Sequence, residues 1–408
     1  MAPSSRSPSL TGLLSGLLPG LLGGGRALAA IVVAGALSLA LSGACSGRPA
    51  PSYGTGSSSS GAGGAGGEGF NLGQGGGCDS LGACGSEIHQ VTFDAPNIYF
   101  VLDASGSMAD LEPGTNKSRY NLVRAAATQV ILNLGPRINV GAAVFPYGNL
   151  NQSPCSPGEE VMPITPGDPT GDDSGTVAMF KAATSLSPFG GTPVAATLEN
   201  LVPNLSAAAA ERRTIVLLLT DGGPNCNPDL VCGVSGCMPN IEGVCVPTEN
   251  CCAVDHPSGG PLLCLDDQAT IAAVGDVAAL GVDVYVIGIS DSALYASTLD
   301  AMAVAAGTAE PGSPSYQQVT DLSALESTFS KIAAEAVSCE LSVGDPPADK
   351  GFTNVYFDCD VVTYDPAQGW DWLDDGTIRL NGASCAKLKS GEVSEVKIAT
   401  GCPTEVPE

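Results

Sequence analysis

The chain has 408 residues, 44% of them hydrophobic, which suffices for one full-sized domain with smaller attachments. Forty-two acidic residues outnumber sixteen basic ones and give a formal net charge of −26. Like-charge repulsion therefore argues against nucleic acid and against a bare anionic membrane as partners. Only two histidines occur, His89 and His256, so acid–base catalysis lacks its commonest residue and we do not expect an enzyme.

The fifteen cysteines lack the short paired spacings of a zinc site, so they predict disulfide bonds and an oxidising compartment outside the cytoplasm. An odd count leaves one cysteine over, and lipid modification of Cys45 would account for it. The fourteen disulfide candidates are then Cys78, Cys84, Cys155, Cys226, Cys232, Cys237, Cys245, Cys251, Cys252, Cys264, Cys339, Cys359, Cys385 and Cys402.

Residues 1–45 have the layout of an export signal. Arg6 and Arg26 precede an apolar run over 27–42, which two small residues and Cys45 follow. The end of this run is similar to the lipobox of bacterial lipoproteins, with its leucine one position farther from the cysteine. The resemblance implies an exported protein of the bacterial cell envelope, an outer-membrane lipoprotein or cell-surface protein that contacts the membrane only through its N-terminus. The alternative is an uncleaved membrane-spanning helix.

Residues 46–87 are expected to form a flexible tether. From 46 to 77 the chain is mostly Gly, Ser, Ala and Pro, which cannot bury enough apolar surface to fold. A coil of about 32 residues has a root-mean-square span of roughly 30 Å. Cys78 and Cys84 are predicted to close a small loop before the folded part begins.

The main domain is expected over residues 88–338, and its first strand carries the clearest chemical signal. An apolar run from Asn97 ends in Asp103, and Ser105 and Ser107 follow at alternate positions. One carboxylate and two hydroxyls are hard oxygen donors that suit Mg²⁺ or Ca²⁺. Taken alone, these residues could equally be turn formers and a helix N-cap.

Periodicity predicts the remaining elements of this domain. Further strands are expected at 138–145, 214–220, 282–289 and 317–319, and helices at 119–134, 176–186, 193–201, 267–280 and 322–337. Strands that alternate with helices predict an α/β fold with a doubly wound, mostly parallel sheet covered on both faces. In such sheets ligands bind beyond the carboxyl ends of the strands, where the winding direction reverses.

Two later segments add to the signal after the first strand. Thr192 lies in a Gly-Gly-Thr-Pro loop, and Asp221 directly follows the strand at 214–220. The three segments in this order resemble the von Willebrand factor A (VWA) domain family, over roughly residues 90 to 338. Thr192 also has a purely structural interpretation as the N-cap of a helix beginning at Pro193.

The resemblance implies a metal-ion-dependent adhesion site (MIDAS). Its ligands would be Asp103, Ser105, Ser107, Thr192 and Asp221, with the strands that end in the two aspartates as neighbours. The ion would be Mg²⁺, or else Mn²⁺ or Ca²⁺, with one coordination position open for an Asp or Glu carboxylate of a protein partner. This implies a surface-anchored, divalent-cation-dependent adhesion or protein-binding lipoprotein.

A cysteine-rich insertion is expected at residues 224–265, directly after the second aspartate. It holds seven cysteines and little apolar content, so it depends on cross-links. Seven cysteines cannot pair among themselves, and Cys155, in a loop at the same end of the predicted sheet, is expected to supply the eighth. The insertion would overhang the metal site, either as a cap that sets specificity or as an inert loop.

Residues 339–408 are expected to form a small disulfide-linked β module. Short strands are predicted at 354–363, 369–373, 377–380 and 393–400, with a hairpin turn at 374–376. The four cysteines of this segment suggest two bridges, and the pattern indicates no function for the module.

Two other functions fit parts of the sequence. A metal-assisted hydrolase acting on cell-envelope polymers or phosphoesters would rest on the metal alone, without a histidine base. Asp103 as a phosphoryl-accepting nucleophile would need a second acid two residues later, where Ser105 stands instead. In a third interpretation the ion only stabilises the fold.

Overall fold

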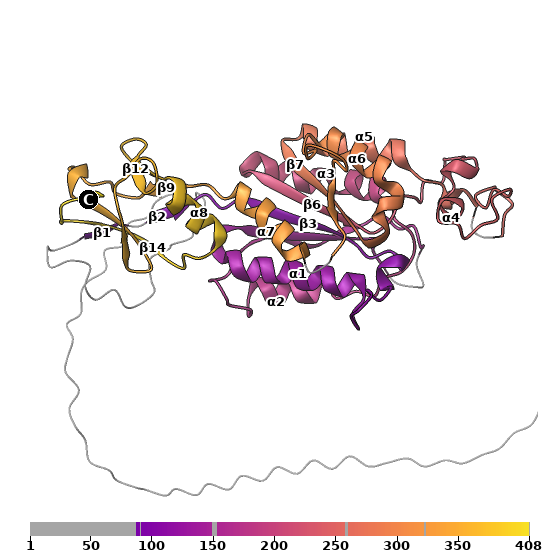
Figure 1. The fold of residues 1–408 in the computed structure, drawn as a ribbon, viewed down its shortest axis with the longest axis horizontal. Coiled ribbons are helices and arrows are strands. Elements are labelled where there is room, and N and C mark those ends of the chain that lie inside the picture. The colour runs from indigo at the N-terminus through magenta and orange to yellow at the C-terminus, as the bar shows by residue number, and fades with distance from the viewer. Residues whose placement is uncertain (1–86, 90, 149–152, 258–259, 322–323, 408) are drawn as a thin grey trace, which may run out of the picture. The chain divides into compact units, whose positions relative to one another are not determined.

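The computed structural model describes residues 87–89, 91–148, 153–257, 260–321 and 324–407 (Figure 1). The proposed export signal with Cys45, most of the tether, and Cys78 and Cys84 lie outside these residues. None of the helices among the described residues is long and apolar enough to cross a membrane.

The main domain is built on a six-stranded sheet, which confirms the predicted α/β fold class. Every strand pairs in parallel except β5, which is antiparallel to β4 at one edge. The order across the sheet is β5 (Glu159–Pro166), β4 (Asn139–Phe145), β3 (Asn97–Asp103), β6 (Thr214–Thr220), β7 (Val282–Ile289) and β8 (Gln317–Val319). The central strands β3 and β6 are therefore neighbours, as the resemblance implied.

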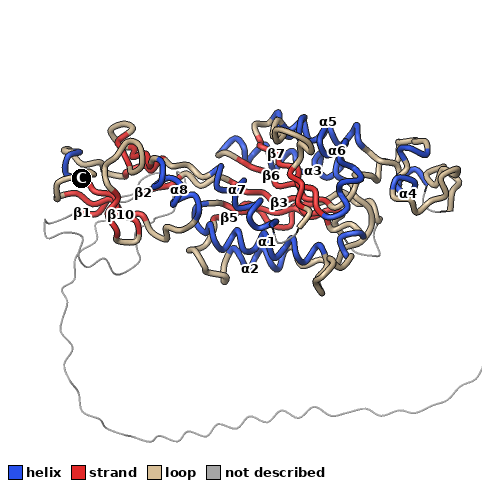
Figure 2. Tube along the Cα trace, viewed as in Figure 1, coloured by secondary structure: helices blue, strands red, loops and turns tan. Residues whose placement is uncertain are grey.

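Helices cover both faces of this sheet, because its central strands are apolar on both sides (Figure 2). On one face Phe100 packs edge-on against Phe180 and Phe329, at ring centroid distances of 5.4 and 5.8 Å. This face carries α1 (Arg119–Leu134), α2 (Thr176–Ala183) and α7 (Leu325–Ala336). The other face carries α3 (Val194–Glu211), α5 (Asp267–Ala279) and α6 (Ala296–Ala306).

The main departures from the predicted elements involve proline. Helix α3 continues through Pro203 to Glu211, beyond the predicted end at residue 201. Pro203 lies on the exposed side of the helix, so the carbonyl that loses its donor faces solvent while the buried leucines keep their helical spacing. The segment 159–166 was expected to be loop, yet it forms β5, because an edge strand tolerates prolines. Helix α6 was not predicted.

The C-terminal β module consists of two four-stranded sheets that also recruit residues from before the main domain. One sheet has the order β1 (Glu87–His89), β14 (Val396–Thr400), β10 (Thr353–Phe357) and β11 (Asp360–Val362). The other has the order β12 (Trp370–Trp372), β13 (Thr377–Leu380), β9 (Glu340–Val343) and β2 (Val91–Phe93), and α8 (Gly382–Ser390) joins the module. Strands β1 and β2 each pair with a strand from the end of the chain, which corrects the expectation that this module begins at residue 339.

The C-terminal module has its own disulfides, separate from those of the insertion. Cys339 is bonded to Cys385 at the start of the C-terminal module, and Cys359 and Cys402 are also disulfide-bonded. The predicted hairpin at 374–376 joins the antiparallel strands β12 and β13. The described part of the insertion contains one short α-helix, α4 (Met238–Ile241), and two 3-10 helices (Val234–Gly236 and Gly260–Leu263).

The Phe100 cluster gives a direct test of the core. Phe100→Ala should lower the free energy of unfolding by about 3 to 5 kcal/mol, because it removes a fully buried ring and two aromatic contacts. Phe352→Ala is the matched control, since Phe352 is 44% exposed and should change stability by about 0.5 kcal/mol or less. Denaturant titration measures both, and equal effects would contradict this description of the core.

Candidate metal centre

The carboxyl ends of β3 and β6 bring two buried aspartates to the same edge of the sheet. Asp103 is the last residue of β3, and Asp221 directly follows β6. Both side chains are almost fully shielded from solvent. Thr220 donates a hydrogen bond from Oγ1 to Oδ2 of Asp103 at 2.7 Å, which ties the two strand ends together.

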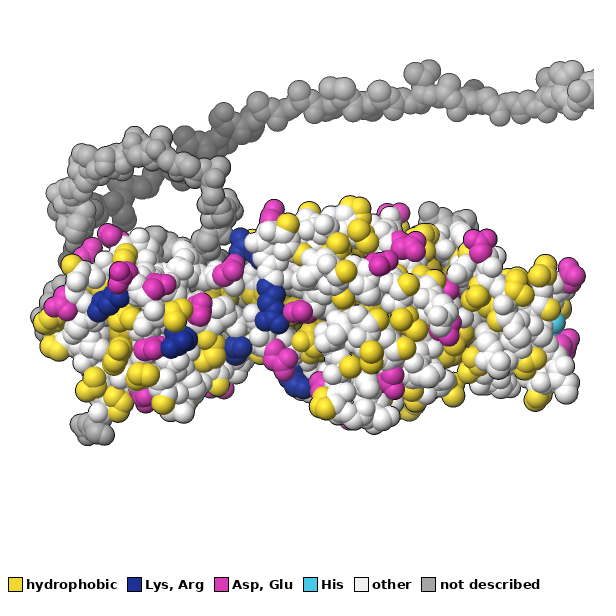
Figure 3. All heavy atoms as spheres, turned by 90° about the horizontal axis from the view of Figure 1, so that it is seen from above, with side chains coloured by type: hydrophobic (Ala, Val, Ile, Leu, Met, Phe, Trp, Pro, Cys, Tyr) yellow, Lys and Arg dark blue, Asp and Glu magenta, His cyan; other side chains and the backbone are white. Residues whose placement is uncertain are grey.

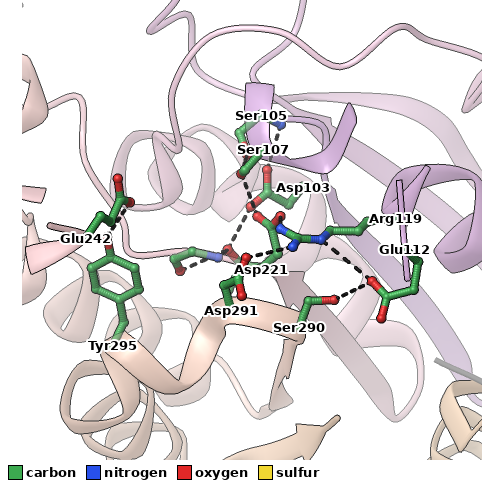
Figure 4. A network of polar contacts seen from close by, with 12 residues as sticks. Asp103, Ser105, Ser107, Glu112, Arg119, Asp221, Glu242, Ser290, Asp291 and Tyr295 are labelled. Atoms are coloured by element: carbon green, nitrogen blue, oxygen red, sulfur yellow. Dashed lines mark hydrogen bonds and ion pairs between the residues drawn. The ribbon is translucent and has the colours of Figure 1, made fainter. Parts of the chain in front are cut away.

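The turn after β3 directs both serines toward the second aspartate (Figure 4). The amide of Ser105 donates to Oδ1 of Asp103 at 2.7 Å, which closes the turn. The Oγ atoms of Ser105 and Ser107 lie 3.2 Å apart, and Ser107 donates from Oγ to Oδ1 of Asp221 at 2.7 Å. The fully buried side chain of Met108 anchors the short 3-10 helix Gly106–Ala109 that carries Ser107. The two segments thus form a continuous chain of oxygen atoms.

The loop that contains Thr192 is docked on the same turn through its backbone. The amide of Gly106 donates to the carbonyl of Gly190 at 3.0 Å, and the amide of Phe189 donates to the carbonyl of Ala104 at 2.8 Å. Gly190 has φ +73° and a Cβ there would lie 2.2 Å from the carbonyl oxygen of Pro154, so no larger residue fits. The loop that carries Thr192 is therefore held close to the turn that carries the two serines.

Thr192 itself is buried and is held by its main chain. Its amide donates to Oδ1 of Asn225 at 2.7 Å, and its carbonyl accepts from the amide of Asn225 at 2.9 Å. Helix α3 begins at Val194 with Pro193 at the N-cap and no side-chain cap. The alternative interpretation of Thr192 as the N-cap of this helix is therefore wrong, because the chain turns into the helix one residue later.

The electrostatics of the two aspartates are unfavourable without a cation. Burial, followed by the charge of Asp221, raises the pKa of Asp103 to about 7. Burial also raises the pKa of Asp221, against the hydrogen bonds from Arg119 and Ser107 that lower it. A positive charge placed between them would offset both the loss of hydration and the mutual repulsion.

The donor set fits a small divalent cation. Neighbouring ligands of an octahedral Mg²⁺ at 2.0–2.1 Å lie about 3 Å from one another. The separations along the oxygen chain, 3.2 Å from Ser105 to Ser107 and 2.7 Å from Ser107 to Asp221, are of this size. Hydroxyl and carboxylate oxygens are also the ligand types that Mg²⁺, Mn²⁺ and Ca²⁺ prefer.

A buried arginine that the sequence analysis did not single out completes the site. Arg119, the first residue of α1, donates from Nη1 to Oδ2 of Asp221 at 2.7 Å and from Nη2 to Oδ2 of Asp291 at 2.6 Å. Its Nε is buried without a hydrogen bond, 3.8 Å from Oε2 of Glu112, which accepts from the hydroxyl of Ser290. Arg119 holds the Oδ2 side of Asp221 and leaves Oδ1 to Ser107. The sequence gives no sign of this role, because an arginine at the start of a helix in an acidic protein has many possible partners.

The insertion begins beside this site and is held by four disulfides. Cys155 is bonded to Cys226, as the odd number of cysteines in the insertion predicted. The other pairs are Cys232 with Cys264, Cys237 with Cys252, and Cys245 with Cys251. The sulfur atoms of Cys232, Cys252 and Cys264 lie within 4.8 Å of one another, but all three are in disulfides and provide no thiolate for a metal.

Both histidines belong to other parts of the structure. His89 is in β1, and its Nε2 lies 2.9 Å from the hydroxyl of Thr400. His256 is in the insertion, with its Nε2 3.2 Å from a carboxylate oxygen of Glu249. Neither contact involves an aspartate or serine of the metal centre.

The sequence matches no protein-family model and no curated protein. Among solved structures, the pilus adhesin SpaC from Lactobacillus rhamnosus GG has 17% identity and a TM-score of 0.43, with 75% of this chain and 39% of SpaC covered. Proximal thread matrix protein 1 from the mussel byssus, solved with a zinc-occupied MIDAS motif, has 16% identity and a TM-score of 0.35 over 62% of this chain and 50% of its own. A von Willebrand factor type A protein from Catenulispora acidiphila has 14% identity and a TM-score of 0.34 over 79% and 62%. This chain spans about two fifths of the length of SpaC, and the function proposed below rests on the residues of the site itself.

The raised pKa of Asp103 predicts how pH acts on the metal-free protein. An acid whose pKa is about 7 in the folded state and about 3.9 when unfolded stabilises the fold at low pH and loses this contribution as pH rises through 7. Asp103→Asn removes the charge, so in EDTA its melting temperature relative to wild type should rise between about pH 5 and about pH 8, by about 2 °C or more. A difference that does not change with pH would contradict the buried-charge description.

Arg119 should matter most when no metal is bound. In EDTA, Arg119→Gln should lower stability by about 3 to 5 kcal/mol, because it leaves Asp221 buried without its ion pair. Saturating Mg²⁺ should shrink this loss, since the cation supplies the missing positive charge. The control is Arg213→Gln, which breaks an exposed ion pair with Asp283 and should cost about 1 kcal/mol or less at either metal level. An Arg119→Gln loss that Mg²⁺ leaves unchanged would contradict the assignment of the site.

Proposed function

We propose that this protein is a divalent-cation-dependent adhesion protein that binds another protein through its metal centre. Asp103, Ser105, Ser107, Thr192 and Asp221 would hold the ion, which we take to be Mg²⁺, with Mn²⁺ or Ca²⁺ as alternatives. The observation that carries the proposal is the oxygen chain from Ser105 through Ser107 to Asp221, whose members come from two neighbouring strand ends.

The donor set also supports a role in binding a partner. Of the five residues, three contribute uncharged hydroxyls, so a bound divalent ion would keep electrophilic character and could accept a further oxygen ligand. An Asp or Glu carboxylate of the partner is the ligand that best suits such an ion. The part this chain plays is to hold Asp221 by Arg119 on one side, so that its other oxygen and the two serines face the same point.

We further propose that the protein is exported and anchored at the surface of a bacterial cell envelope. The disulfides of the insertion support an oxidising location. The lipobox-like end at Cys45 would provide the anchor, and the Gly- and Ser-rich segment after it would give the domain reach from the membrane.

The hydrolase alternative finds no support among the described residues. Both carboxylate oxygens of Asp103 accept hydrogen bonds, from the amide of Ser105 and the hydroxyl of Thr220, which orient the carboxylate, and Ser105 stands where a phosphoryl-accepting aspartate would need a second acid. The contacts described for His89 and His256 lie away from the centre, so neither is placed to act as a general base there.

The proposal is tested by capture of partners from an envelope extract in Mg²⁺ and in EDTA. Ser107→Ala removes one hydroxyl from the donor set and should weaken capture in Mg²⁺ by about tenfold or more, while EDTA should abolish it for every form of the protein. Asp173→Ala, which removes an exposed carboxylate paired with Lys181, is the matched control and should bind as wild type does. Capture that persists in EDTA, or that survives Ser107→Ala unchanged with the fold intact, would refute the mechanism.

A further inference from the structure

All five valines of the cysteine-rich insertion lie on its surface. They are Val231, Val234, Val244, Val246 and Val254, with exposed fractions between 39% and 79%, and we call them the valine surface. The interior of the insertion is instead made of cysteines, with Cys237 and Cys264 fully buried. In the main sheet, by contrast, valines are buried almost without exception. Their exposure on a loop that disulfides hold in place makes the insertion a candidate interaction site.

The disulfides fix the backbone beneath this surface. Each of the five valines lies within two residues of a bridged cysteine: Val231 and Val234 flank Cys232, Val244 and Val246 flank Cys245, and Val254 follows Cys252. Valine side chains are also restricted at χ1. A partner that docks here would therefore find the surface already ordered, and little conformational entropy would be lost on binding.

The charge of this region has one sign. No Lys or Arg occurs from residue 214 to residue 330, while the insertion exposes Asp229, Glu249 and Asp255. On the face drawn in Figure 3, the Lys and Arg side chains lie away from the end that holds α4. At the α4 end, hydrophobic and acidic side chains are visible. The charge complement of such a surface is a basic one.

The insertion is also continuous with the metal centre. Asn225, in its first residues, holds the backbone of Thr192, and Cys226 is bonded to Cys155. Glu242, next to α4, accepts a 2.6 Å hydrogen bond from the hydroxyl of Tyr295, in the same short 3-10 helix (Ser290–Tyr295) that presents Asp291 to Arg119 (Figure 4). A protein bound at the metal would therefore meet the insertion as well.

We propose that the valine surface and the exposed acidic residues of the insertion dock a basic segment of the partner protein, rich in Lys and Arg. The long aliphatic stems of these residues would lie on the valines while their charged ends pair with Asp229, Glu249 and Asp255. This docking proposal rests on the proposed function, because it describes the part of the partner that surrounds the carboxylate bound to the metal. Valine is seldom a binding hot spot itself, so the partner supplies the large anchoring side chains.

The probe is a library of random peptides displayed on phage and selected on the immobilised full-length protein in Mg²⁺ and in EDTA. The test variants are the triple substitution Val231→Thr, Val244→Thr, Val254→Thr, which keeps side-chain shape and net charge, and the double reversal Asp229→Lys, Asp255→Lys. Val304→Thr, at an exposed valine of α6, is the matched control. Non-reducing peptide mapping verifies that each variant keeps its four insertion disulfides.

Peptides selected on wild type and on Val304→Thr should be enriched in Lys and Arg, and both test variants should reduce that enrichment. For the double reversal the reduction should be up to about fivefold for each exposed ion pair lost. Unchanged enrichment on the triple valine variant would overturn the proposal, because attraction to the overall negative charge would then explain the basic peptides. Absence of Lys and Arg enrichment on wild type would overturn it too.

The metal arm separates this proposal from the proposed function. Enrichment of Asp or Glu that occurs in Mg²⁺ and vanishes in EDTA supports the metal-dependent function. Lys and Arg enrichment that persists in EDTA and still depends on the valines supports the docking surface, even where no metal-dependent acidic residue is selected.

Discussion

Two carboxylates buried at neighbouring strand ends are the constraint on which the rest of this structure depends. Asp103 and Asp221 face the same space with almost no access to solvent, where each raises the cost of ionising the other. Among the described residues, the positive charge paired with Asp221 comes from Arg119, and that guanidinium is shared with Asp291. Such a site is poised for a further cation, and the oxygen atoms of Ser105, Ser107 and Asp221 are of the type and spacing that a small divalent ion requires.

The surrounding fold holds the two aspartates and the two serines in place. Parallel pairing of β3 with β6 sets the distance between the two aspartates, and packing on both faces of the sheet keeps the strands from shifting. Backbone hydrogen bonds dock the loop at Gly190 on the turn that carries the serines. The insertion adds a rigid, acidic and apolar surface directly beside this arrangement, held by disulfides where a hydrophobic core is missing.

Much of this could be predicted from the sequence because the signals were local or strictly periodic. Strand and helix periodicity predicted β3, β6, β7 and α1 at the bounds found in the structure, and the resemblance to the VWA family implied that β3 and β6 are neighbours. Arg119 and Asp291 were missed because their pairing joins a helix start to a distant loop. No pattern in one sequence marks such a contact.

Other misses have equally specific causes. The helix predicted at 193–201 continues through Pro203, because a proline on the solvent side costs a helix little when the buried face continues. Strands β1 and β2 are three residues each, and they acquire their meaning only by pairing with strands that follow about 250 to 310 residues later. Strands this short form because of the strands they pair with, and their own composition does not predict them.

The central claim is that one hard divalent ion binds between the ends of β3 and β6. Crystals grown with Mn²⁺ and measured for anomalous scattering test it most directly. The account predicts a single strong peak coordinated by the hydroxyls of Ser105 and Ser107 and by a carboxylate of Asp103 or Asp221, directly or through water. Saturating Mn²⁺ that leaves this position empty, with Ser105 still hydrogen-bonded to Ser107 and Ser107 to Asp221, would contradict it.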